Sequence, residues 1–155
     1  MNDSSANSVL KDRDCARAVV QDLEETKDLL EAKIRIFARL GREREMMDAF
    51  HRYAAITEDP FANSALLEEM AWGVIEKGFA VSAPVTRVVA LLAAKTANLS
   101  RGITLLERGI TDPHAGVRTV AMQFISAFRD DRLQEAVLRV LQSEKSFPVR
   151  LAAIT

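Results

Sequence analysis

The stretch Asp112-Pro113-His114-Ala115-Gly116-Val117-Arg118 decides the fold, because a second version of it follows further along the chain. That version is Phe147-Pro148-Val149-Arg150. In both, a proline precedes a Val-Arg pair, and a small residue, Ala121 or Ala153, follows on the same helical face. Recurrence of a motif at a fixed step of roughly 20 to 50 residues is typical of repeat architectures. We therefore expect stacked helical repeats.

The same step extends toward the N-terminus, since Val85, Val117 and Val149 are evenly spaced along the chain. The apolar residues from Val117 to Phe128 lie at the three- and four-residue spacing of one face of an α-helix, and period-two alternation does not persist anywhere. The sequence predicts an all-α protein in which each unit is a helix, a turn and a second helix.

These residues resemble the HEAT repeat family in its short bacterial form, over residues 64–155. The resemblance implies an α-solenoid of stacked antiparallel helix pairs. It also implies that Asp112, Arg118 and Arg150 form a structural hydrogen-bond ladder between repeats. The first unit departs from the family pattern, because Thr86 follows Val85 and the arginine, Arg87, comes after it.

In that family the second helices line the concave side of the solenoid. An alignment of the units on their valines matches Arg87 with Thr119, and Leu91 with Gln123. The resemblance therefore implies that Arg87, Lys95, Thr119 and Gln123 face a binding partner.

Three regions are predicted along the chain: a flexible N-terminus over 1–8, a helical hairpin or cap over 9–58, and HEAT-like repeats over 59–155. The hairpin consists of helices over 9–40 and 43–57, separated at Gly41, which tolerates the left-handed conformation after a helix. The array is expected to be truncated at its C-terminal end, since the residues after Arg150 do not form a polar cap.

Helix starts are predicted from capping residues. Asp59-Pro60 is expected to begin a helix over 61–77 that Gly78 ends, and Asp130-Asp131 to begin another. The helix over 84–97 is expected to bury a stripe made of Val85, Val88, Val89 and Leu92.

Composition excludes several classes of protein. The chain has 155 residues, 48% of them hydrophobic, a net charge of −1 and one cysteine, which argues against a disordered chain and against a disulfide scaffold. The polar N-terminus does not resemble a secretory signal, and the uninterrupted apolar run Val88–Ala94 is too short to span a bilayer. We expect a cytoplasmic protein without a membrane partner.

The sequence offers no recognisable catalytic set. His51 and His114 lack metal-ligand spacing, and the adjacent carboxylates Glu68-Glu69 and Asp130-Asp131 point to different sides of a helix. No cofactor and no metal are predicted.

Three functions remain open. The leading hypothesis is a non-enzymatic scaffold or adaptor that binds another protein, with self-association through the N-terminal helices. The second is nucleic-acid binding through a concave face, as in HEAT-like DNA-repair glycosylases, because residues 79–155 carry a net charge of +4. The third is a lyase or lyase subunit, because short HEAT-like repeats also resemble phycobilin lyases.

Overall fold

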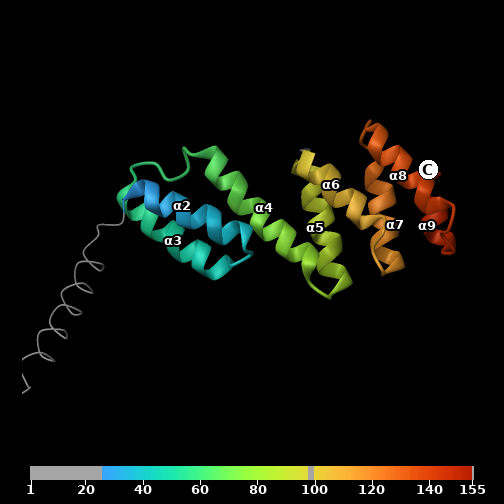
Figure 1. Ribbon diagram of the computed structural model, residues 1–155, viewed down its shortest axis with the longest axis horizontal. Helices are drawn as coiled ribbons and strands as arrows, with labels where there is room; N and C mark the ends of the chain where they lie inside the picture. Colours follow the sequence, from blue (N-terminus) through green and yellow to red (C-terminus); the bar gives the residue numbers. More distant parts are fainter. Residues whose placement is uncertain (1–25, 98–99, 155) are drawn as a thin grey trace, which may run out of the picture.

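The computed structural model describes residues 26–97 and 100–154, and over these residues it contains eight helices and no strand (Figure 1). This confirms the all-α prediction. The helices are α2 (Lys27–Arg39), α3 (Glu43–Ile56), α4 (Ser64–Ala80), α5 (Pro84–Ala97), α6 (Ser100–Gly109), α7 (Ala115–Ile125), α8 (Asp131–Leu141) and α9 (Phe147–Ala152). Residues 9–25 of the first predicted helix lie outside the described residues.

The helices follow one another along the long axis of the molecule, from α2 and α3 at one end to α8 and α9 at the other (Figure 1). Helix α2 packs on α3 and on α4, and α4 packs on α5. Helix α7 lies between α5 and α9 and packs on both. Helices α5, α7 and α9 therefore lie side by side.

Over residues 26–97 and 100–154, the buried apolar residues form two separate clusters. The N-terminal cluster joins α2 and α3 to the first half of α4, and includes Ile34, Tyr53 and Leu66. The C-terminal cluster runs from Trp72 in α4 to Ala152 in α9. Helix α4 is the element that contributes to both.

Two glycines allow backbones to approach closely. A Cβ atom on Gly73 of α4 would lie 2.6 Å from the carbonyl oxygen of Ala38 in α2, and one on Gly102 of α6 would lie 2.5 Å from that of Ala94 in α5. Gly41 has a φ of 65° and reverses the chain after α2, as predicted.

The predicted bounds of α4 were wrong. The helix begins at Ser64, where the Asn63 side chain accepts a hydrogen bond from the N–H of Leu66, and it continues through Gly78 to Ala80. The Asp59 carboxylate instead accepts from the N–H of Phe61, in the loop before the helix. Asn63 lies nearer the apolar run than Asp59 and caps the helix, so α4 begins at Ser64 and not directly after Asp59-Pro60.

The predicted buried stripe of α5 was wrong for three of its four residues, since only Val88 of the four packs against the C-terminal cluster. Val85, Val89 and Leu92 are 76%, 58% and 50% exposed. The buried face contains Arg87, Leu91 and two small residues, Ala90 and Ala94. Small residues allow the close approach of α6, so they occupy the face that packs, and the larger valines point outward.

Candidate functional site

Arg87 links the turn before α5 to the turn before α7. Its Nε and Nη2 atoms donate to the two carboxylate oxygens of Asp112, at 2.7 and 2.9 Å. Its Nη1 atom donates to the carbonyl oxygens of Val81 and Ser82, at 3.0 and 2.6 Å. Asp112 also accepts from the N–H of His114 at 2.8 Å. The acceptors of this cluster are therefore oxygens of two turns, the one before α5 and the one before α7.

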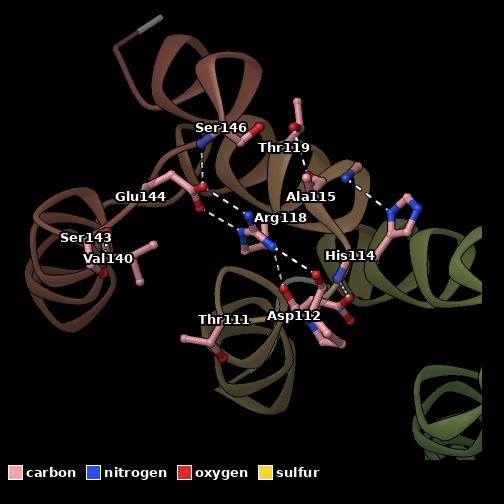
Figure 2. Close-up of polar contacts among 12 residues, drawn as sticks. Thr111, Asp112, His114, Ala115, Arg118, Thr119, Val140, Ser143, Glu144 and Ser146 are labelled. Carbon is pink, nitrogen blue, oxygen red and sulfur yellow. Dashed lines mark hydrogen bonds and ion pairs between the residues drawn. The ribbon is translucent and has the colours of Figure 1, made fainter.

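Arg118 repeats this arrangement one unit further along (Figure 2). Its Nε and Nη2 atoms donate to the carboxylate of Glu144 at 2.7 and 3.0 Å. Its Nη1 atom donates to the carbonyl oxygens of Asp112 and Pro113 at 2.9 and 3.2 Å. Glu144 also accepts from the N–H of Ser146 at 2.8 Å.

The two clusters follow one positional rule. Each arginine is the fourth residue of its helix, Arg87 in α5 and Arg118 in α7. Each carboxylate lies three residues before the first residue of a later helix, Asp112 before α7 and Glu144 before α9. Arg87 therefore corresponds to Arg118, and not to Thr119. We call these two clusters, Arg87 with Asp112 and Arg118 with Glu144, the arginine ladder.

Burial and hydrogen bonding set the charge states of the ladder. Burial alone would raise the pKa of Asp112, but the hydrogen bonds from Arg87 and from the His114 N–H outweigh it and lower that pKa. The hydrogen bond from Arg118, aided by the Ser146 N–H, lowers the pKa of Glu144 to about 2. Both carboxylates are therefore ionised at neutral pH, and both arginines are neutralised by them.

The alignment on the valines predicted that Arg87 faces a partner. The structure instead buries this side chain, of which only 11% is exposed. Glu144 was missed by the sequence analysis as a ladder residue. It follows Asp112 at the same interval that separates Val117 from Val149, and this signal could have identified it.

The other residues predicted to face a partner have different environments. The Nζ atom of Lys95 lies 4.8 Å from the centre of the Phe124 ring, which joins α5 to α7 by a cation–π contact. The hydroxyl of Thr119 donates to the carbonyl oxygen of Ala115, and Gln123 is exposed on α7. Arg150 is exposed and is the fourth residue of α9.

An exposed apolar surface lies on α5. Val85, Val89 and Leu92 occupy successive turns of one face of this helix. Neighbouring exposed valines, leucines and similar side chains on one face are characteristic of interaction surfaces. We call these three residues the α5 stripe.

The remaining chemistry-bearing groups have structural contacts. The Nδ1 atom of His114 accepts from the N–H of Gly116 at 3.2 Å and caps α7. Within residues 26–97 and 100–154, no three His, Cys, Asp or Glu side chains are grouped so that they could hold a metal ion. None of the described helices is long and apolar enough to cross a membrane.

Comparison of the chain with protein-family models, with curated proteins and with solved structures finds no match.

Proposed function

We propose that this chain is a HEAT-like α-solenoid that binds another protein through the α5 stripe. The single observation that carries the proposal is the exposure of Val85, Val89 and Leu92 on a helix whose opposite face is packed against its neighbours. Covering three such side chains would contribute roughly 3 kcal/mol, or about 100-fold in affinity.

The solenoid part of the proposal is supported by the arginine ladder and by the packing of α7 between α5 and α9. A repeated contact at a repeated helical position is what a stack of equivalent units requires. The resemblance to HEAT repeats over 64–155 points in the same direction.

The charges of the arginine ladder favour a protein partner over a nucleic acid. Binding of nucleic acid depends on arginines and lysines that are free to contact phosphates. Arg87 and Arg118 each donate two hydrogen bonds to a carboxylate, so their charge is balanced within the chain.

The test is affinity enrichment of the tagged chain from extract of its source cells, divided into nuclease-treated and untreated halves. Three baits are compared: the unaltered chain, the stripe variant Val85→Gln/Val89→Gln/Leu92→Gln, and a control. The control, Ile36→Gln/Ile56→Gln/Leu138→Gln, changes three exposed apolar residues on other helices. Circular dichroism establishes that all three baits keep the same helix content.

We expect one protein that is enriched equally in both halves, is depleted at least tenfold by the stripe variant, and is retained by the control. Equal depletion by both variants would exclude the α5 stripe as the binding surface. Enrichment that disappears with nuclease would replace the protein partner with a nucleic acid.

A further inference from the structure

The apolar surface of the α5 stripe is not shared by the neighbouring helix α7. The arginine ladder defines which positions of the two helices are equivalent. In this register Val85 corresponds to Gly116 of α7. Leu92 corresponds to Gln123. All four residues are exposed, so at two of the three stripe positions α7 presents a glycine or an amide where α5 presents an apolar side chain.

The stripe has the spacing of a surface that binds a helix. Its residues stand at positions i, i+4 and i+7 of α5 and extend over about 10 Å along the helix axis. Amphipathic helices are recognised through apolar anchors at these same intervals. The other faces of α5 pack on α4, α6 and α7. A further helix on the stripe would therefore extend the side-by-side packing that α5, α7 and α9 already show.

Lys95 places a positive charge beside one end of the stripe. It lies three residues after Leu92 and is partly buried, with its Nζ atom 4.8 Å from the centre of the Phe124 ring. Within the residues that the structure describes, it has no ion pair with a carboxylate. The sequence has no acidic residue between Glu76 and Glu107, so nearby positions do not balance this charge. A carboxylate on the occupant of the stripe is the complementary group.

We propose that the partner binds the α5 stripe through an amphipathic helix whose apolar face covers Val85, Val89 and Leu92, and whose carboxylate pairs with Lys95. This inference rests on the proposed function and names the element of the partner that makes the contact. The occupant is a segment of a different protein. Residues of this chain, from the same copy or from a second one, are the other occupants that the experiment distinguishes.

The first experiment identifies the residues that contact the stripe. Full-length chains carry p-benzoylphenylalanine in place of Val85, Val89 or Leu92, one position per chain, and are irradiated in nuclease-treated extract of the source cells. A chain with the same group in place of the exposed Leu138 on α8 is the control. Mass spectrometry identifies the cross-linked residues. We expect the three stripe positions to cross-link to one segment of one protein, at residues three, four or seven apart, and the control to miss that segment.

The outcomes separate this inference from the proposed function. Cross-links to several segments of the partner, or to residues two apart as in a strand, would overturn the helix and leave the α5 stripe as the binding surface. Cross-links to residues of this chain would overturn the different protein. If the stripe variant depletes no protein in the enrichment described above, the proposed function is overturned, and this inference with it.

The second experiment tests the charge pair. The cross-linked segment is synthesised as a fluorescein-labelled peptide and titrated with the full chain, and binding is followed by fluorescence anisotropy. Lys95→Gln should weaken binding about three- to fivefold, the effect of a partly exposed ion pair. Lys95→Arg should preserve the affinity, and Lys145→Gln, at an exposed lysine away from α5, should leave it unchanged.

A peptide in which the acidic residues are replaced by their amides completes a double-mutant cycle. With this peptide, Lys95→Gln should no longer weaken binding, because the carboxylate is already absent. A loss that persists with the amide peptide, or no loss with either peptide, would overturn the pairing of Lys95.

Discussion

Replacing Glu144 with glutamine removes the charge from one of the two bidentate pairs of the arginine ladder. The pKa of Glu144 falls from 4.5 to about 2 in the folded protein, mainly through the hydrogen bond from Arg118. A difference of that size between unfolded and folded states corresponds to at most about 3 kcal/mol of stability at neutral pH. Because 18% of the Arg118 side chain remains exposed, we expect Glu144→Gln to lose about 2 kcal/mol at pH 7.

The pH dependence follows from the direction of the shift. The folded pKa lies below the unfolded one, so the contribution is complete above about pH 5 and is lost as the pH falls toward 2. At pH 3 more than half of it is gone. The difference in unfolding free energy between the unaltered chain and Glu144→Gln should therefore shrink from about 2 to below about 1 kcal/mol.

The assay is urea unfolding followed by circular dichroism at 222 nm, at pH 7, 5, 4 and 3. Asp112, the other carboxylate of the ladder, is present in both proteins, so the difference between the two curves isolates Glu144. The exposed Glu135→Gln on α8 is the control, and it should change the free energy of unfolding by less than about 0.5 kcal/mol. A Glu144→Gln difference that stays constant from pH 7 to pH 3 would refute the reasoning.

Three further changes test the packing, each by urea unfolding. Gly73→Ala places a Cβ atom 2.6 Å from a backbone oxygen of α2 and should cost about 2 kcal/mol or more of unfolding free energy. In Gly78→Ala the new Cβ atom has no contact closer than 3.7 Å, so this change should stabilise the fold by about 0.5 kcal/mol. A similar effect at both positions would contradict the close approach of α4 to α2. Leu133→Ala in the C-terminal cluster should cost about 2 to 4 kcal/mol, and the exposed Leu138→Ala less than about 0.5, so equal losses would place the core of α8 elsewhere. Asp130→Ala removes the side-chain cap of α8 and should cost about 1 kcal/mol, and an unchanged midpoint would show that this cap does not hold the helix.

Residues that cap or end helices explain why most helix bounds could be predicted from the sequence. Gly41 adopts the left-handed conformation and ends α2. The Asp130 carboxylate accepts hydrogen bonds from two backbone N–H groups at the start of α8 and caps that helix. These features act within a few residues and do not depend on the rest of the fold. The start of α4 was harder, because Asp59 and Asn63 both suit a helix start and the choice depends on where α4 packs.

Tertiary packing explains why the buried face of α5 could not be predicted from its sequence. Apolar residues surround most of this helix, so its spacing does not identify the face that is buried. The face with Ala90 and Ala94 is the buried one because Gly102 of α6 closely approaches the backbone of α5 at Ala94. A preference that a neighbouring helix sets is not visible in the pattern of α5 itself.

The ladder could be predicted only in part for a similar reason. The family resemblance identified Asp112 and Arg118, but alignment on the valines moved Arg87 by one position. The arginines of α5 and α7 lie one position closer together in the sequence than Val85 and Val117 do. Side-chain contacts, and not apolar spacing, define the equivalent positions.

Helix α4 belongs to both apolar clusters, with Leu66 and Met70 in one and Trp72 and Phe79 in the other. In the part of the chain that the structure describes, the free energies of unfolding of the two halves are therefore linked through α4. Loss of α2 or α9 removes contacts from one half only, whereas loss of α4 removes contacts from both. Cooperative unfolding of the whole chain thus depends on α4, and amides in its middle should exchange with solvent only when both halves open together.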